Sequence, residues 1–272
     1  MKSLGEVLKL SSQFLADRKI GRSRRIAEEL IGHVLHLKRI ELYLRFDQPV
    51  VETELGAIRT LLKRCGKGEP VEYVVGEVEF FGCQIQVDSR VLIPRPETEI
   101  LVEKIAKRVE KGVLWDLCTG SGCIGIALQK ARPGLRVVLA DSSKEALAIA
   151  AENARRNQVD VEIVQGDLLA PFQGRRADII VCNPPYISEA EFKRLDPSVK
   201  DFEPREALVG GERGTEFYER LARELPPFLN PGGHIFFEIG STQAEVVKRL
   251  FPSGEVERDW AGHPRFFHSA QT

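Results

Sequence analysis

The chain has 272 residues, enough for one large domain or for a large and a small one. Its composition, 43% hydrophobic and 29% charged, is that of a globular protein, and no apolar run approaches the roughly 18 residues that a membrane-spanning helix needs. The first ten residues lack the apolar core of a signal peptide, and the five cysteines form no Cys-x-x-Cys pair. We therefore expect a cytoplasmic protein with reduced thiols, no metal site and no membrane partner.

The net charge of −1 hides an asymmetry along the chain. Residues 1–70 hold 14 Lys and Arg against 9 Asp and Glu, whereas the remainder holds 25 against 31. A basic first segment could face an acidic protein or RNA, or it could be a solvated helical surface. We favour the solvated surface because no aromatic residues interleave with the charges.

The first segment has the periodicity of helices. Apolar residues recur at helical spacing in residues 3–16, 22–37 and 51–65, with Ser23 and Thr53 as plausible N-caps. We predict a small helical bundle over residues 1–69. From Val71 to Pro94 the pattern alternates with a period of two, which predicts a β-hairpin within a linker of residues 70–95.

The second domain, residues 96–272, alternates strands and helices. It opens on a helix with Pro96 in its first turn, an interpretation that leaves Arg95 without a role. Strands are predicted at 113–117, 136–140, 161–164, 177–182 and 234–239, and helices at 122–130, 143–156, 215–225 and 242–250. This rhythm is typical of an α/β fold with a mostly parallel sheet and helices on both faces. It lapses in the polar loop between Ile187 and Gly214, which we interpret as a lid.

The most informative stretch is the strand that ends at Asn183-Pro184-Pro185-Tyr186. Prolines cannot donate to a sheet ladder, so the strand stops at a rigid corner, where open α/β sheets bind their ligands. The Asn183 amide can donate and accept, the two prolines fix the direction of nearby carbonyls, and Tyr186 offers a flat ring. Such a corner can hold a planar –NH2 group.

A glycine-rich loop follows the first parallel strand of this domain. Cys118, Thr119, Gly120, Ser121 and Gly122 lead into a helix, and Asp141 ends the next strand, 21 residues after Gly120. This pattern fits a nucleotide-like cofactor, either NAD or S-adenosylmethionine, with Asp141 on the ribose hydroxyls.

A further carboxylate follows the third strand of the domain. Asp167, beside Leu168, could accept from an adenine amino group, although a cap of a helix or turn would explain it nearly as well.

Together these segments resemble the S-adenosylmethionine-dependent methyltransferases with a Rossmann-like sheet. Three further stretches narrow the resemblance to the release factor glutamine methyltransferase family (PrmC/HemK): Pro70-Val71-Glu72-Tyr73-Val74-Val75-Gly76, Ile93-Pro94-Arg95-Pro96-Glu97-Thr98-Glu99 and Glu203-Pro204-Arg205-Glu206-Ala207-Leu208. The resemblance covers essentially the whole chain, including the helical first domain, whereas the Asn-Pro-Pro-Tyr motif is shared with enzymes that methylate adenine N6.

The resemblance implies methyl transfer from S-adenosylmethionine to the side-chain amide nitrogen (N5) of the glutamine in the Gly-Gly-Gln motif of class 1 peptide chain release factors. It implies catalytic roles for Asn183, Pro184 and Tyr186, substrate contacts from these residues and Pro185, and a substrate-recognition role for residues 1–69. The cofactor would be held by the following residues: Cys118, Thr119, Gly120, Ser121, Gly122, Asp141, Asp167, Leu168 and Asn183.

The sequence departs from the family at two positions. Cys118 replaces a usual glycine, and Leu168 replaces a frequent aromatic residue. If position 118 needs a positive φ, the cysteine strains the loop.

Three alternatives remain open: a nucleic-acid amino methyltransferase, an NAD-dependent dehydrogenase and a noncatalytic cofactor-binding protein. The near-neutral charge disfavours direct nucleic-acid binding. A dehydrogenase leaves Asn183-Pro184-Pro185-Tyr186 unexplained, and the intact polar corner argues against a noncatalytic role.

Overall fold

The computed structural model describes residues 2–270 and divides the chain into two compact units. One unit holds the residues up to Gly76 together with Asp196–Phe202; the other holds Glu77–Leu195 and the residues from Glu203 onward. Within residues 2–270, no helix is both long enough and apolar enough to cross a membrane.

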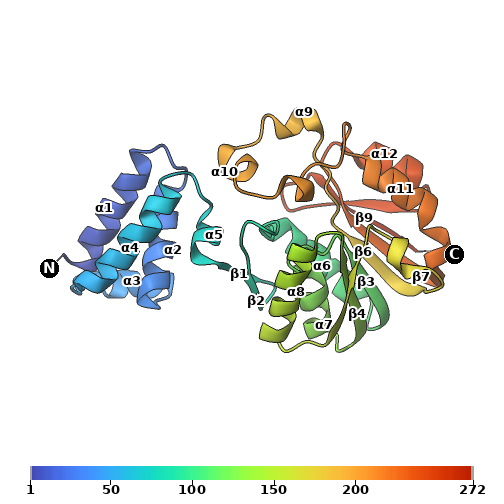
Figure 1. Cartoon of the computed structure of the whole chain (residues 1–272), viewed down its shortest axis with the longest axis horizontal. Helices are drawn as coiled ribbons and strands as arrows, with labels where there is room; N and C mark the ends of the chain where they lie inside the picture. Colours follow the sequence, from blue (N-terminus) through green and yellow to red (C-terminus); the bar gives the residue numbers. More distant parts are fainter. Residues whose placement is uncertain (1, 271–272) are drawn as a thin grey trace. The chain divides into compact units, whose positions relative to one another are not determined.

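The first unit is a helical bundle with its own apolar core (Figure 1). Its helices are α1 (Leu4–Ala16), α2 (Ser23–Leu35), α3 (Arg39–Leu44), α4 (Glu52–Cys65), α5 (Val71–Val75) and α10 (Pro197–Lys200). Leu8, Leu30 and Ile58 are among its fully buried side chains, as the helical spacing predicts. The short α3 was not predicted.

The predicted caps of α2 and α4 were wrong by one or two residues. Arg22 takes the N-cap position of α2 in a left-handed conformation, so Ser23 is already helical. At α4 the N-cap is Val51, whose backbone N–H donates to the Glu54 carboxylate at 3.0 Å. An acidic side chain in the first turn thus replaces the hydroxyl cap that we expected at Thr53.

The first unit also contains a helix in a segment that we had predicted as strand. Val71–Val75 form α5, which starts after Pro70 and ends at Gly76 with φ 87°. The hairpin is therefore confined to β1 (Glu77–Phe80) and β2 (Cys83–Gln86). Proline before the first turn and a left-handed glycine after the last favour a helix over an extended chain.

The second unit is built on a seven-stranded sheet, and the predicted α/β class is confirmed. Its strands are β3 (Lys111–Leu117), β4 (Gly134–Asp141), β5 (Val161–Gln165), β6 (Ala177–Cys182), β7 (Leu229–Glu238), β8 (Glu255–Arg258) and β9 (Pro264–Ala270). The order is β5-β4-β3-β6-β7-β9-β8; the first five are parallel, and β9 pairs antiparallel with β7 and β8.

Helices cover the sheet on both faces (Figure 1). The long ones are α6 (Pro96–Arg108), α7 (Cys123–Ala131), α8 (Lys144–Arg156), α11 (Glu216–Glu224) and α12 (Ala244–Leu250). The unit also has short helices: η1 (Ala170–Phe172), α9 (Glu189–Phe192), η2 (Arg205–Ala207) and η3 (Pro226–Phe228). The core centres on Trp115 of β3, which stacks on Phe172 with ring centroids 4.0 Å apart.

Hydrogen bonds join the hairpin to α8. Asn153 of α8 accepts from the Gln86 backbone N–H at 2.7 Å and donates to the Ser121 carbonyl at 2.9 Å. The buried Asn153 thereby connects β2 to the glycine loop after β3. A side-chain amide can do this because it donates and accepts at once.

Candidate functional site

The predicted site residues follow the carboxyl ends of parallel strands. The glycine loop follows β3, Asp141 ends β4, Asp167 follows β5 and Asn183 follows β6. Because β5, β4, β3 and β6 are consecutive neighbours in the sheet, these ends share one edge. The topology thus brings the predicted cofactor loop and the predicted catalytic corner to the same edge.

The glycine loop has a left-handed backbone at three positions. Cys118, Gly120 and Gly122 have φ values of 54°, 53° and 81°. The strain predicted for a non-glycine residue at position 118 is therefore present, at a cost of about 1–2 kcal/mol. A Cβ at Gly120 would meet no atom within 4 Å, so this part of the loop leaves room for a ligand against the backbone.

Asp116 of β3 is a buried carboxylate that the sequence interpretation missed. Its Oδ2 accepts from the Thr119 hydroxyl at 2.7 Å and from the Gly125 backbone N–H at 2.9 Å. Its Oδ1 is buried and has no hydrogen-bond partner in the described part of the chain. Burial raises the pKa of Asp116 to about 7. The sequence feature that could have identified Asp116 is a single carboxylate within the otherwise apolar residues 113–117.

Asp141 lies where we predicted it, and its carboxylate fixes the loop. One oxygen accepts from the Gly120 backbone N–H and the other from the Ser143 backbone N–H, both at 2.9 Å. Burial raises the pKa of the Asp141 carboxyl despite these bonds. Each oxygen retains a lone pair for a ligand hydroxyl, so ribose binding stays a prediction.

Asp167 is paired with a residue that the sequence did not point to. The Arg220 guanidinium of α11 donates to both carboxylate oxygens, each at 3.0 Å. The Asp167 side chain is 60% exposed, so the pair contributes orientation more than stability. Leu168, the other residue predicted here, has φ 48° and belongs to the buried core of the sheet.

The geometry of this edge fits an adenosyl cofactor with a positively charged sulfur. Asp116 offers an unpartnered buried oxygen, Asp141 a second carboxylate, and Gly120 open space beside the backbone. Acceptor oxygens suit ribose hydroxyls and a cationic ligand, and backbone without a side chain permits close approach.

The corner after β6 combines a free amide with a fixed backbone. The Asn183 side chain is half-buried and makes no hydrogen bond with any residue from 2 to 270, whereas Pro184 and Pro185 are buried. The Tyr186 hydroxyl donates to Glu238 Oε1 at 3.4 Å. Burial, followed by the charge of Glu238, raises the pKa of Tyr186, so the phenol stays neutral. Asn183 is therefore the free polar group of the corner.

Glu238 and Thr98 support the corner and were also missed. Glu238 ends β7 and is buried, and its Oε2 accepts from the Thr98 hydroxyl of α6 at 2.6 Å. Burial raises the pKa of the Glu238 carboxyl. Glu238 directly follows the apolar run Ile235-Phe236-Phe237. As for Asp116, a carboxylate next to such a run was the sequence feature that could have identified it.

Arg95 has a partner in the loop that we interpreted as a lid. Its guanidinium donates to Glu203 at 2.5 Å, and the same buried carboxylate accepts from the Ile93 backbone N–H at 3.1 Å. The helix-start interpretation left Arg95 without a role, and the structure supplies a partner that lies 108 residues away in sequence. Whether the loop closes over a ligand stays a prediction.

Neither a metal cluster nor a disulfide occurs in the part of the chain that the structure describes. All five cysteines are free thiols, and no three His, Cys, Asp or Glu side chains between residues 2 and 270 are placed to hold a metal ion.

Comparison with known proteins identifies relatives over nearly the whole chain. The family model of the PrmC N-terminal domain matches residues 6–76, and that of the methyltransferase small domain matches residues 96–195. The chain is 43% identical to a release factor glutamine methyltransferase of Chlamydia trachomatis, over 96% of this chain and 92% of that protein. It is 40% identical to one of Geobacter sulfurreducens, over 92% and 88%.

Solved structures of methyltransferases share the fold at low identity. A Pyrococcus furiosus methyltransferase superposes with a TM-score of 0.54 and 19% identity, over 70% of this chain and 90% of that one. A Thermus thermophilus 16S rRNA N2 G1207 methyltransferase, solved with AdoMet and guanosine, gives 0.52 and 17%, over 72% and 50%. These structures share only the fold, whereas the sequence relatives show that the chain belongs to the release factor glutamine methyltransferase family.

Proposed function

We propose that this protein transfers a methyl group from S-adenosylmethionine to the side-chain amide nitrogen of the glutamine in the Gly-Gly-Gln motif of class 1 peptide chain release factors. Membership of the family supports the reaction and the cofactor. The structural observation that carries the proposal is the half-buried Asn183 amide, without an internal partner, beside two buried prolines at the site edge.

The chemical problem is that an amide nitrogen is a poor nucleophile, because its lone pair is delocalised. Asn183 Oδ1 and the Pro184 carbonyl would accept the two amide hydrogens and so direct the lone pair, while Tyr186 packs on the amide plane. Orientation of this kind can lower a barrier by about 7–11 kcal/mol. The two acceptors also favour the positive charge that develops on nitrogen. S-adenosylmethionine supplies the electrophilic methyl group on a positively charged sulfur.

Four groups of the chain would hold the cofactor. The Asp141 carboxylate would bind the ribose hydroxyls, the Asp167 carboxylate the adenine amino group, and the backbone of residues 118–122 would line the loop. Asp116 adds an unpartnered oxygen from β3. The proposed domain division is the bundle of residues 1–69, a linker of residues 70–95 and the methyltransferase domain of residues 96–272.

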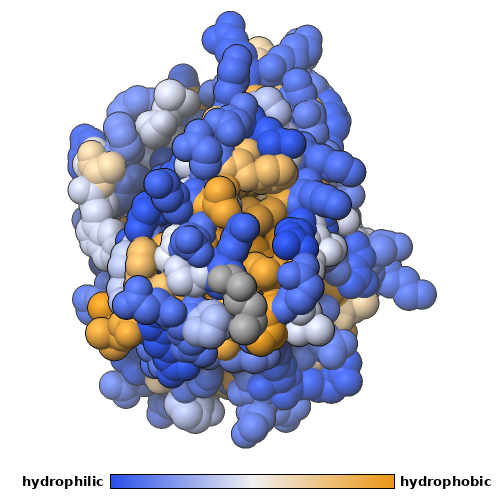
Figure 2. All heavy atoms as spheres, turned by 90° about the vertical axis from the view of Figure 1, so that its left-hand side faces the viewer, coloured by the Kyte–Doolittle hydropathy of each residue, from blue (hydrophilic) through white to orange (hydrophobic). Residues whose placement is uncertain are grey.

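The bundle offers a surface for recognising the protein substrate. A groove of about 180 Å³ lies between α1 and α4, lined by apolar side chains and by Lys2, Arg59 and Lys63. Leu10 in this groove is 52% exposed. Figure 2 shows apolar side chains gathered on this side of the molecule among hydrophilic ones. We infer that the groove binds a segment of the release factor that carries apolar side chains beside acidic ones.

The proposed substrate also indicates the cellular compartment of the reaction. A factor that acts in translation is methylated in the cytoplasm, and recognition of a protein needs no direct contact with nucleic acid.

The proposal is tested by methyl transfer from labelled S-adenosylmethionine. The acceptors are a class 1 release factor, the same factor with the Gly-Gly-Gln glutamine changed to alanine, and ribosomal RNA. We expect label only in the unchanged factor. Label in RNA, or label retained in the altered factor, would contradict the proposed substrate.

Two asparagines separate catalysis from stability. Asn183→Ala removes a side chain without an internal hydrogen bond, so the free energy of unfolding should change by less than about 0.5 kcal/mol. The methyl-transfer rate should fall about 100- to 1,000-fold, as for a preorganised oxyanion-hole donor. Asn230→Ala, the control, breaks a 2.8 Å bond to Asp178 at the other end of the sheet. It should lower stability and spare the rate. A wild-type rate in Asn183→Ala would mean that the corner is only structural.

A further inference from the structure

Gln243 lies between β7 and α12 and joins three segments through one side-chain amide. Its Oε1 accepts from the Gly240 backbone N–H at 2.9 Å. Its Nε2 donates to the Tyr186 carbonyl at 2.8 Å and to the Gly214 carbonyl at 2.9 Å. The residue is 6% exposed, so both donors and an acceptor are used in a buried setting.

The segments that Gln243 joins are packed backbone to backbone. Ile187 donates to the Leu208 carbonyl and accepts from the Gly210 N–H, both at 2.9 Å. A Cβ at Gly210 would lie 2.2 Å from the Pro185 carbonyl oxygen, and a Cβ at Gly214 would lie 2.3 Å from the Tyr186 carbonyl oxygen. The backbones are in close contact here, so the position of the Asn183–Tyr186 corner depends on the packing of residues 208–214 against it.

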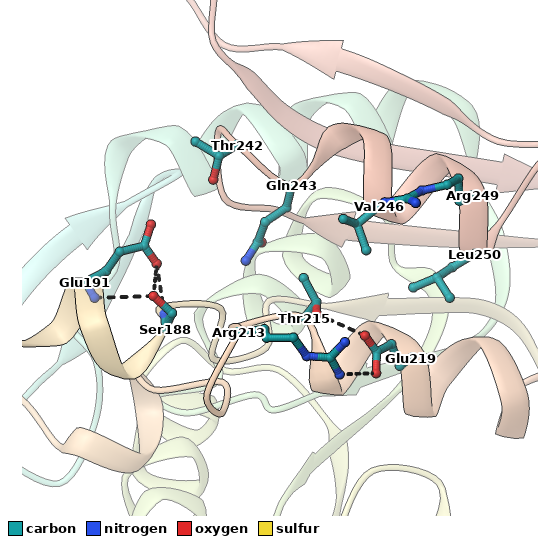
Figure 3. A pocket seen from close by; sticks show the side chains of 10 residues that line it. All are labelled: Ser188, Glu191, Arg213, Thr215, Glu219, Thr242, Gln243, Val246, Arg249 and Leu250. Carbon is teal, nitrogen blue, oxygen red and sulfur yellow. Dashed lines mark hydrogen bonds and ion pairs between the residues drawn. The ribbon is translucent and has the colours of Figure 1, made fainter.

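The Gln243 side chain forms part of the wall of a cavity of about 560 Å³. Figure 3 shows it reaching from the chain before α12 toward the loop that carries Ser188, Arg213 and Thr215. Within this region, the Gln243 amide nitrogen donates to the carbonyl of Tyr186, the last residue of the corner, and to the carbonyl of Gly214. The residues predicted to hold the cofactor after β3, β4 and β5 do not hydrogen-bond to Gln243.

We propose that Gln243 is a positioning residue for methyl transfer, which fixes the Asn183–Tyr186 corner through the Tyr186 carbonyl and the Gly214 segment. The inference rests on the proposed function. A displacement of about 1 Å at a reacting centre can cost about 100-fold in rate. Loss of the two Gln243 donors should therefore lower kcat about 10- to 100-fold, while cofactor affinity stays within twofold.

Two variants of equal length separate positioning from packing. Gln243→Met removes the donors and the acceptor at every pH. Gln243→Glu, when ionised, presents a carboxylate to two carbonyl oxygens. When protonated it regains one donor and keeps an oxygen for the Gly240 N–H. Burial raises carboxyl pKa values, so this protonation should occur within the assay range.

At each pH, the methyl-transfer rate of each variant is divided by the wild-type rate at the same pH. The charged groups around the cavity are Glu191, Arg213, Glu219 and Arg249, with Glu216 accepting from the Thr215 N–H. Glu245 lies in the first turn of α12, and Glu238 ends β7. All are present in the wild type and the variants, so their own titration largely cancels. The ratio for Gln243→Glu should rise at least fivefold from pH 8 to pH 6, and that for Gln243→Met should stay flat.

The experiment measures single-turnover methyl transfer to a Gly-Gly-Gln factor, cofactor affinity by calorimetry and folding by circular dichroism. Thr242→Val, a change at an exposed neighbour in the same cavity wall, is the control and should keep wild-type turnover. Wild-type kcat in Gln243→Met would overturn the inference. Equal, pH-independent ratios for both variants, or parallel losses of kcat and cofactor affinity, would also overturn it. No transfer by the wild type would refute the proposed function instead.

Discussion

Burial of Asp116 should make the stability of the ligand-free protein depend on pH. Its folded-state pKa is raised from 3.8 to about 7, chiefly because burial disfavours the charged form. Between these values the folded state keeps a proton that the unfolded state has lost. Stability therefore falls as pH rises through this window and levels off above the folded-state value.

The size of the effect follows from the two pKa values. Linkage predicts that Asp116 alone lowers the free energy of unfolding by about 2.5 kcal/mol between pH 5 and pH 8. Asp116→Asn keeps an oxygen for the Thr119 hydroxyl and the Gly125 N–H but cannot ionise. The variant should lack this part of the pH dependence. At pH 8 it should equal or exceed the wild type in stability, although its amide nitrogen leaves two buried N–H donors unpaired.

The assay is urea unfolding at pH 5 and pH 8 without cofactor, because a bound cation beside Asp116 would favour the charged form. The matched control is Asp160→Asn, the same change at an exposed residue. We expect the control to follow the wild type, and Asp116→Asn to show a shallower decline by about 2.5 kcal/mol. Identical declines in the wild type and Asp116→Asn would refute the argument that the buried carboxyl retains its proton.

Two further predictions concern the cofactor loop and the bundle. Asp141→Ala should weaken S-adenosylmethionine binding by about 1–3 kcal/mol, measured by calorimetry, because it removes an acceptor for ribose and leaves the Gly120 N–H unpaired. An unchanged affinity would show that Asp141 does not belong to the site. Leu10→Asp places a negative charge in the α1–α4 groove, where it would repel the acidic segment that we propose to bind there. It should raise KM for the whole release factor and leave kcat and cofactor affinity within about twofold. An unchanged KM would show that the groove has another purpose.

Much of the sheet, and the edge to which the proposed site residues come, could be predicted from the sequence. Apolar, β-branched runs such as residues 177–182 mark buried strands whatever surrounds them, and Pro184 fixes where β6 ends. The alternation of strands and helices then brings the loop after β3 and the corner after β6 to one edge. The short helices α3 and α5 escaped prediction because one or two turns are too few to show a helical period.

The supporting contacts could not be predicted, because they join residues far apart in sequence. Glu203 contacts Arg95 across 108 residues, and Tyr186 contacts Glu238 across 52. Nothing local distinguishes Glu203 from a solvated carboxylate, and the apolar run before Glu238 indicates burial but does not identify its partner. Strands β8 and β9 were missed for a related reason: β9 pairs antiparallel with β7, and β8 pairs antiparallel with β9, which are tertiary contacts.

Cys118 and Leu168 show where the departures from the family pattern have their effect. Both have a positive φ. At Cys118, which replaces a glycine, this conformation costs about 1–2 kcal/mol, whereas at Leu168 an aromatic residue would bear the same cost. Neighbouring hydrogen bonds nevertheless fix both turns: Thr119 N–H donates to the Ala140 carbonyl at 3.0 Å, and Gly166 N–H to the Asp141 carbonyl at 3.0 Å. Backbone strain persists where the surroundings determine the conformation in this way. The cost at Cys118 therefore falls on the free energy of folding, while these hydrogen bonds hold the backbone of the loops that we propose to line the cofactor.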